Sequence, residues 1–156
     1  MHRVSDMKSK LAIAVLLLIV VVPASALPAS TPHAKAETAI RAVLDAQAAA
    51  WNHGDLEGYM EGYDRSPNTE FVGGDRINRG WQAVLDRYKK AYDTREKMGT
   101  LTFSDLEITL LSKDAALVLG RWRLKRANDE PHGTFTLLFR KTKAGWRIVH
   151  DHSSSA

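Results

Sequence analysis

The spacing of hydrophobic and polar positions changes once along the chain. From Glu37, hydrophobic residues recur at the three- and four-residue spacing of one helix face, which predicts a first helix that ends at residues 52–54. Asp55 can cap a second, short helix, and the spacing over residues 81–92 predicts a third. Between them, the apolar pair at 71–72 and the Gly-Gly that follows indicate a small strand and a turn.

After Gly99 the period becomes two, which is typical of half-buried strands. Four strands joined by short turns are predicted, over residues 101–112, 115–126, 132–142 and 145–153. The hydrophobic positions change parity at Ser104-Asp105, which predicts a β-bulge that bends the first of these strands. Helices followed by antiparallel strands indicate an α+β domain whose helices cover one face of a curved sheet.

The first 26 residues have the pattern of a secretory signal peptide. Basic residues precede an apolar run over residues 11–22, and Ala24-Ser25-Ala26 has the small-x-small pattern of a signal-peptidase site. Because this run is shorter than the roughly 20 residues of a membrane-spanning helix, an uncleaved anchor is the less favoured alternative. We expect an exported protein, periplasmic or secreted and without a stable membrane anchor, with a flexible tail over 27–36 and one domain over 37–154.

Composition narrows the classes of partner. The whole chain has a net charge of +4, but the expected leader carries three Lys/Arg and one Asp, so 19 basic and 17 acidic residues remain. That near-balance argues against nucleic acid as a partner. The chain has no cysteine, which excludes disulfides and thiolate chemistry and leaves the domain to be held by its core. No residue pattern calls for a cofactor.

The last strand carries the candidate chemistry. Strict alternation from Gly145 would place four side chains on one face, namely Trp146, Ile148, His150 and His152, and Arg147, Val149, Asp151 and Ser153 on the other. The two imidazoles would then lie roughly 6.6–7 Å apart along the chain, close enough to reach one ligand. We expect both to project into a hollow between helices and sheet, where a histidine could act as a general base. The alternative is that one histidine is a hydrogen-bonded residue of the wall and the other is solvated at the end of the strand.

Other groups qualify this interpretation. A metal site would need a third protein ligand, and His132 is the one spare histidine expected nearby, so no metal is predicted. Asp151 lies on the opposite face of the same strand and cannot orient either imidazole, which leaves Glu70 and Asp75 as candidate carboxylate partners. Gly-x-Ser-x-Gly and a glycine-rich phosphate loop are both absent from the sequence.

Two segments carry a family resemblance. Ala50-Trp51-Asn52-His53-Gly54-Asp55-Leu56-Glu57-Gly58-Tyr59 resembles a helix junction of SnoaL-like domains in the nuclear transport factor 2-like superfamily. Residues 145–154 are similar to the last strand of these domains, above all to that of the association domain of calcium/calmodulin-dependent protein kinase II. The resemblance spans residues 37–154. It implies a cone-shaped, cystatin-like α+β fold, with helices packed on a strongly bent antiparallel sheet around a cavity, and it implies a homodimer or larger ring.

The resemblance does not fix the function, because relatives include isomerases, cyclases, dehydratases and assembly modules. The acidic base and Tyr/Asp pair of ketosteroid isomerases cannot be matched here residue by residue. The association domain of the kinase lines its cavity with several arginines, and only Arg121 of this chain matches one of them. The resemblance would place Arg121 inside the cavity. An aromatic set at helix and strand spacings is either simple core or the wall of a small-molecule pocket: Trp51, Tyr59, Tyr63, Trp81, Tyr88 and Trp122.

We therefore expect an exported SnoaL-like domain that binds a small organic molecule in an aromatic-lined cavity. One alternative is an isomerase, dehydratase or hydratase that uses a cavity histidine as its base. The other is a non-catalytic homo-oligomerisation module whose cavity is filled.

Overall fold

The helices precede most of the sheet, as the two hydrophobic periods predict. A computed structural model describes residues 31–156, so the expected signal peptide lies outside the described residues. The helices are α1 (Pro32–Asn52), α2 (Leu56–Met60), α3 (Trp81–Ala91) and α4 (Arg95–Met98). The strands are β1 (Glu70–Gly73), β2 (Arg76–Arg79), β3 (Thr100–Ser112), β4 (Ala115–Lys125), β5 (His132–Thr142) and β6 (Gly145–Ser153).

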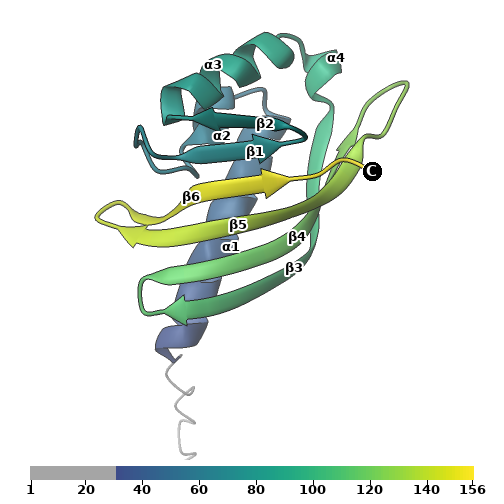
Figure 1. The fold of residues 1–156 in the computed structure, drawn as a ribbon. Coiled ribbons are helices and arrows are strands. Elements are labelled where there is room, and N and C mark those ends of the chain that lie inside the picture. The colour runs from purple at the N-terminus through teal and green to yellow at the C-terminus, as the bar shows by residue number, and fades with distance from the viewer. Residues whose placement is uncertain (1–30) are drawn as a thin grey trace, which may run out of the picture.

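One sheet of six strands runs in the order β2-β1-β6-β5-β4-β3 (Figure 1). The four long strands form the antiparallel meander that the sequence predicts. The short hairpin of β1 and β2 joins β6 in parallel, with Glu70 opposite His150, and this pairing was not foreseen. The result is the predicted α+β architecture, in which the helices lie on one side of a strongly bent sheet.

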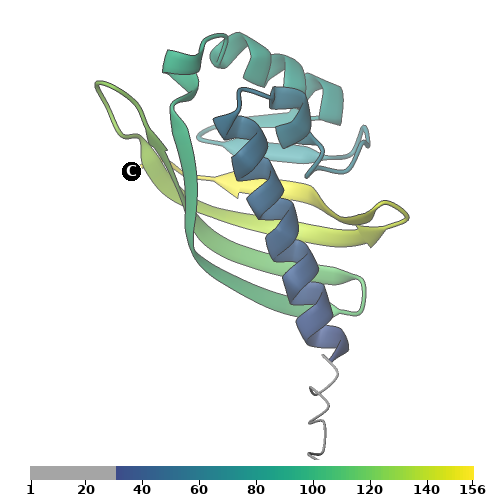
Figure 2. The same cartoon turned by 180° about the vertical axis from the view of Figure 1, so that it is seen from behind.

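α1 crosses the concave side of the sheet (Figure 2). Its buried face carries Ile40, Leu44, Gln47 and Trp51. The helix begins at Pro32, so the prediction of a flexible tail up to residue 36 is wrong for 32–36. Thr31 explains the early start, because its hydroxyl accepts a hydrogen bond from Ala34 N at 3.1 Å and proline suits the first helical position. Within residues 31–156, none of the helices has the length and apolar content needed to cross a bilayer.

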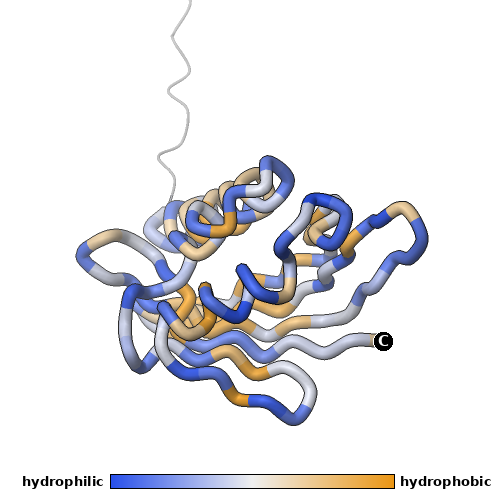
Figure 3. Tube along the Cα trace, turned by 90° about the horizontal axis from the view of Figure 1, so that it is seen from above, coloured by the Kyte–Doolittle hydropathy of each residue, from blue (hydrophilic) through white to orange (hydrophobic). Residues whose placement is uncertain are grey.

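The bend of the sheet begins in β3. The register of β3 against β4 shifts between Ser104 and Glu107, and Asp105 has a φ of +52°. This is the predicted β-bulge, and it turns Leu106 and Ile108 to the face that Leu101 and Phe103 occupy before it. Seen from above, the helices lie on one side of strands whose hydrophobic and hydrophilic positions alternate (Figure 3). The inner face of the sheet and the helices therefore enclose the core.

Candidate functional site

The helices and the inner face of the sheet enclose a cavity of about 340 Å³. Most of its wall is aromatic or aliphatic. Its polar groups are the hydroxyls of the four lining tyrosines and the side chains of five other residues: Gln47, Arg87, Asp151, Ser153 and Ser155. Gly74 and Ser155 are exposed and Arg87 is half-buried, so these lining residues mark the opening to solvent. The cavity thus combines an aromatic and aliphatic wall with a limited set of polar groups, as in ordinary small-molecule sites.

Five residues of the predicted ligand-binding set line this cavity, namely Trp51, Tyr59, Tyr63, Tyr88 and Trp122. Three of these rings pack edge to face: the ring centroids of Trp51 and Tyr59 are 5.1 Å apart, and those of Tyr59 and Tyr88 are 5.5 Å apart. Trp51 is also fixed by its Nε1, which donates to Met98 O at 3.1 Å. Such interlocked rings make a rigid wall rather than a set of independent side chains.

Trp81, also predicted to bind ligand, does not line the cavity. Its Nε1 donates to Met60 O at 2.8 Å, and the Arg65 guanidinium lies 4.4 Å from its ring centroid. The helical spacing that grouped Trp81 with the cavity residues correctly predicted that its side chain is buried. The ring is used to pack α3 against the end of α2, so its predicted place in the cavity wall is wrong.

The prediction that His150 and His152 project into the hollow is also wrong. In β6, Ile148 lies opposite Phe139, whereas His150 lies opposite Leu138, so Val149 is an extra residue in the strand. This β-bulge reverses the parity of everything after it. Trp146 and Ile148 point inward before the bulge, and the inward residues after it are Asp151 and Ser153.

On the outer face, His150 forms a polar cluster with β1 and β2. Its Nδ1 lies 3.0 Å from Oε2 of Glu70, and Nε of Arg79 donates to Oε1 of Glu70 at 2.8 Å. The hydrogen bond from His150, and then that from Arg79, lower the pKa of the Glu70 carboxyl. Glu70 is thus a carboxylate partner of His150, as its position allowed, but outside the cavity. His152 is exposed on the same face.

The remaining polar candidates do not meet these imidazoles. His132 is exposed, with its Nδ1 2.9 Å from Glu130 O, and Asp75 is exposed in the turn between β1 and β2. Among residues 31–156 there is no group of three or more histidines and acidic residues arranged to hold a metal ion.

Asp151 is the carboxylate that does enter the cavity, and sequence reasoning missed it. It is 3% exposed, and each of its oxygens accepts one hydrogen bond, Oδ2 from the Tyr63 hydroxyl and Oδ1 from the Ser153 hydroxyl, both at 2.7 Å. Burial raises the pKa of the Asp151 carboxyl to about 6, against the lowering effect of the two hydroxyl donors. At neutral pH this carboxylate can therefore accept a proton far more readily than an ordinary aspartate.

The phenols around Asp151 stay neutral. Burial, and next the charge of Asp151, raise the pKa of the Tyr59 and Tyr63 hydroxyls well above the ordinary range, and burial does the same for Tyr88. They therefore act as hydrogen-bond donors and acceptors and not as phenolate bases.

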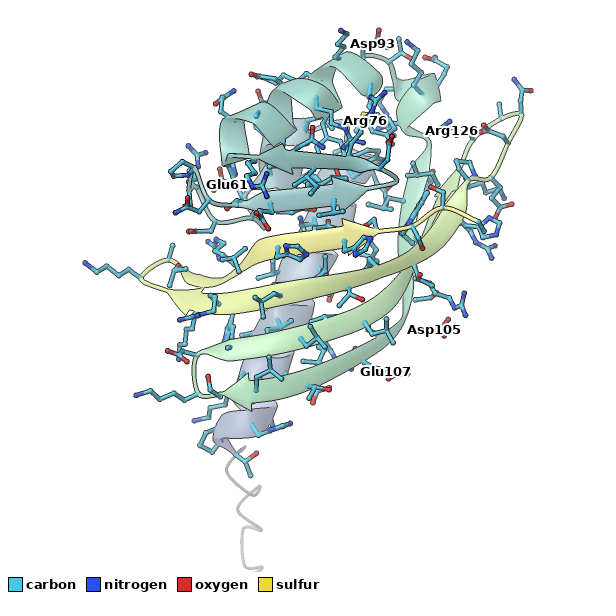
Figure 4. The ribbon with its side chains drawn as sticks, viewed as in Figure 1. Glu61, Arg76, Asp93, Asp105, Glu107 and Arg126 are labelled. Atoms are coloured by element: carbon cyan, nitrogen blue, oxygen red, sulfur yellow. The ribbon has the colours of Figure 1, made fainter. Side chains whose placement is uncertain are left out.

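Arg121 lies outside the cavity, against the expectation from the resemblance. Strand alternation turns it outward between Gly120 and Trp122, and its Nε is 3.2 Å from Oδ2 of Asp105. Asp105 lies on the edge strand β3 (Figure 4). Both side chains are mostly exposed, so this is a surface ion pair of small energetic weight. Trp122, by contrast, lines the cavity and holds the C-terminal segment, since its Nε1 donates to Ser154 O at 2.9 Å.

Known structures share this architecture. An NTF-2 like protein of unknown function from Shewanella oneidensis MR-1 is 43% identical, with 76% of this chain and 98% of that chain covered and a TM-score of 0.73. A calcium/calmodulin-dependent protein kinase II association-domain-like protein from Xanthomonas campestris is 17% identical, with 85% and 93% covered and a TM-score of 0.62. A ketosteroid isomerase-like protein from Erwinia carotovora atroseptica SCRI1043 is 19% identical, with 76% and 94% covered and a TM-score of 0.61.

The proteins from Xanthomonas and Erwinia are less than 20% identical to this chain, so these two similarities show the fold alone. No curated protein matches the chain. The family model described as SnoaL-like domain matches residues 40–156, which is most of the chain. The predicted resemblance is therefore confirmed, and the chain belongs to the SnoaL-like domain family.

Proposed function

We propose that this SnoaL-like domain binds a small organic molecule in its aromatic-lined cavity. The observation that carries the proposal is an open space of about 340 Å³ with one buried carboxyl group in its wall. The volume falls within the range of small-molecule sites, which begins at about 300 Å³. The ligand's apolar body would contact the rings of Trp51, Tyr59 and Tyr88, and Asp151 would supply the fixed polar contact.

A module whose cavity serves only as core is the less favoured alternative. Protein interiors pack closely, and an empty volume of this size in a purely structural domain would reduce its stability. The buried carboxyl group argues in the same direction, because its desolvation is costly and contributes nothing to packing.

A specific observation favours an enzyme as the second candidate. The pKa of Asp151 lies at about 6, and a general base is most efficient when its pKa is close to the working pH. The carboxyl group also borders the cavity. Asp151 would then replace the histidine that the sequence indicated as the base of an isomerase, dehydratase or hydratase. In such a reaction its carboxylate would take a proton from the bound molecule, and the Tyr63 hydroxyl would keep the carboxylate oriented.

Native mass spectrometry of protein purified from its own host tests the binding proposal. We expect an additional mass of a small organic molecule that is lost when the protein is denatured. The matched variant Leu137→Trp narrows the cavity at a buried lining position and should lose that mass while remaining folded. An adduct kept unchanged in the folded Leu137→Trp protein would place the ligand elsewhere and refute the proposal.

We also propose a homodimer that forms through the outer face of the sheet. Leu117 and Leu119 are 38% and 45% exposed on β4, and Leu117 lies opposite Leu138 of β5. Neighbouring exposed leucines on one face of a sheet are a common mark of a protein interface. Export is a further proposal from the sequence, and mass spectrometry of the secreted protein should find a chain that starts near Leu27.

A further inference from the structure

We propose that Arg87 recognises an anionic group of the bound molecule, so that the ligand is a small organic anion with a flat apolar body. This inference rests on the proposed binding function and adds the chemical class of the ligand and its orientation. The acid group would meet Arg87 at the opening, and the apolar body would lie between the aromatic rings further inside.

The first support is the way Arg87 is held. It extends from α3 over the cavity wall, with its Cζ 4.8 Å from the centroid of the Phe71 ring and 5.7 Å from that of Tyr88. Arg87 is half-buried and is part of the cavity lining. A guanidinium over aromatic rings is fixed in place by these contacts, and its N–H groups stay available in the fork geometry that suits a carboxylate.

The second support is that the Arg87 guanidinium has only aromatic contacts among residues 31–156. The guanidinium forms no ion pair and no hydrogen bond with these residues, whereas other polar side chains of α3 do. Lys89 Nζ lies 2.5 Å from Glu57 Oε1, and Asp86 Oδ1 accepts a hydrogen bond from Gln82 at 2.9 Å. A half-buried cation that points to a cavity and lacks a counter-charge favours an anionic ligand.

The opening itself leaves space for such a group. A Cβ at Gly74 would meet nothing within 4 Å, so the turn between β1 and β2 is open beside the cavity. A Cβ at Gly73 would lie 3.1 Å from Cε1 of Phe71, so this glycine allows the Phe71 ring to lie close to the strand beneath Arg87. The glycines therefore contribute both the room at the opening and the ring that supports the guanidinium.

The charges also set the direction of the ligand. Asp151 is 3% exposed and pairs in register with Phe71, so a carboxylate borders the inner cavity while a guanidinium lies at its opening. An acid group placed against Asp151 would be repelled, and a cationic group would have to pass Arg87. An anion with its charge at the opening and a neutral body inside satisfies both groups.

Two fluorescent probes with the same hydrocarbon frame test this inference. 8-Anilino-1-naphthalenesulfonate carries one sulfonate, and N-phenyl-1-naphthylamine is its neutral counterpart. Only the fluorescence that is lost in the Leu137→Trp variant is counted as cavity binding, because both probes also bind exposed apolar surface. We expect the anionic probe to bind the wild type more tightly than the neutral one.

The variants separate Arg87 from general electrostatics. In Arg87→Gln the Kd of the anionic probe should rise about tenfold, as for a lost charge-assisted hydrogen bond, and that of the neutral probe should change less than about twofold. Lys90→Gln removes the same charge from an exposed position of α3 and should leave both constants unchanged. Arg87→Lys should restore part of the affinity for the anion, with circular dichroism verifying that each variant is folded.

Each other outcome has a distinct meaning. If both probes bind in the cavity and Arg87→Gln weakens them equally or not at all, the assignment of Arg87 is wrong and the proposed function stands. If Lys90→Gln weakens the anionic probe as much as Arg87→Gln, the preference is general electrostatics and the assignment is again wrong. If neither probe shows binding that Leu137→Trp removes, the proposed cavity function fails and the inference fails with it.

Discussion

The hydroxyl of Tyr63 donates a 2.7 Å hydrogen bond to Oδ2 of Asp151, which joins the end of the helical layer to the last strand. The backbone connects the same two regions. Ile148 N donates to Gly62 O and Asp64 N donates to Ile148 O, both at 2.9 Å, immediately before the extra residue Val149. The β-bulge that turns Asp151 inward and the phenol that receives it therefore belong to one arrangement.

We predict that Asp151→Asn removes a pH-dependent loss of stability. Burial raises the pKa of Asp151 from 3.8 to about 6, so the folded protein holds this proton to a higher pH than the unfolded chain. As the pH rises from about 4 to about 6, the free energy of unfolding falls, and it keeps this reduced value above that range. A difference of about two pKa units corresponds to about 3 kcal/mol at pH 7.

Urea unfolding of both proteins from pH 4 to pH 7 measures this effect. The free energy of unfolding of the wild type should fall relative to that of Asp151→Asn as the pH rises, and the other carboxyl groups cancel in the comparison. A difference that stays constant over the range, or grows in favour of the wild type, would contradict a raised pKa.

Tyr63→Phe should raise the pKa of Asp151 further. The variant removes the donor to Oδ2, which is one of the two hydrogen-bond donors that stabilise the charged form. At pH 7 the buried carboxylate loses a hydrogen bond, at a cost of about 1.5–3 kcal/mol in the free energy of unfolding. Carbon-13 NMR titration of the Asp151 carboxyl measures the first effect and urea unfolding the second. Tyr92→Phe removes another hydroxyl from the cavity lining and serves as the control, with no shift expected.

The sequence was sufficient for most of the fold because its periods are long and regular. The helical spacing before Tyr92 and the alternation after Gly99 predicted the three main helices and the four-stranded meander. The short elements α4 and β2 were missed, because four residues are too few to show a period. The parallel pairing of β1 with β6 depends on contacts distant in sequence and has no local signal.

The site was predictable only in its aromatic part. A buried ring leaves a periodic signal, which is why Tyr59 and Tyr88 were found, but the same signal does not tell which side of a helix faces a cavity, and Trp81 was misplaced. In β3 a change of parity among apolar residues revealed the bulge at Asp105. In β6 the residues after Val149 are polar on both faces, so the second bulge left no comparable signal and Asp151 was placed outside.

Loss of both imidazoles should leave the cavity intact. We predict that the double variant His150→Gln, His152→Gln binds N-phenyl-1-naphthylamine within about twofold of the wild type, because neither side chain lines the cavity. The pKa of Glu70 should rise towards its ordinary value, since the hydrogen bond from His150 is the main cause of its lowering. Fluorescence and NMR titration measure the two effects. A tenfold loss of probe affinity would show that the imidazoles reach the cavity after all.

The proposed dimer leads to a prediction on the outer face of the sheet. Leu119→Glu places a charge beside the exposed Leu117 of β4, and in a dimer formed through this face that charge would be buried without a partner. We expect the Kd of the dimer to rise by about a hundredfold or more, as for an uncompensated buried charge. Light scattering coupled to size-exclusion chromatography should then find one chain where the wild type shows two.

Ala83→Glu is the control for this variant, because it adds the same side chain to an exposed position of α3, on the helical side. It should leave the dimer unchanged. A wild type that is monomeric at all concentrations, or a dimer that Leu119→Glu does not weaken, would contradict the use of this face.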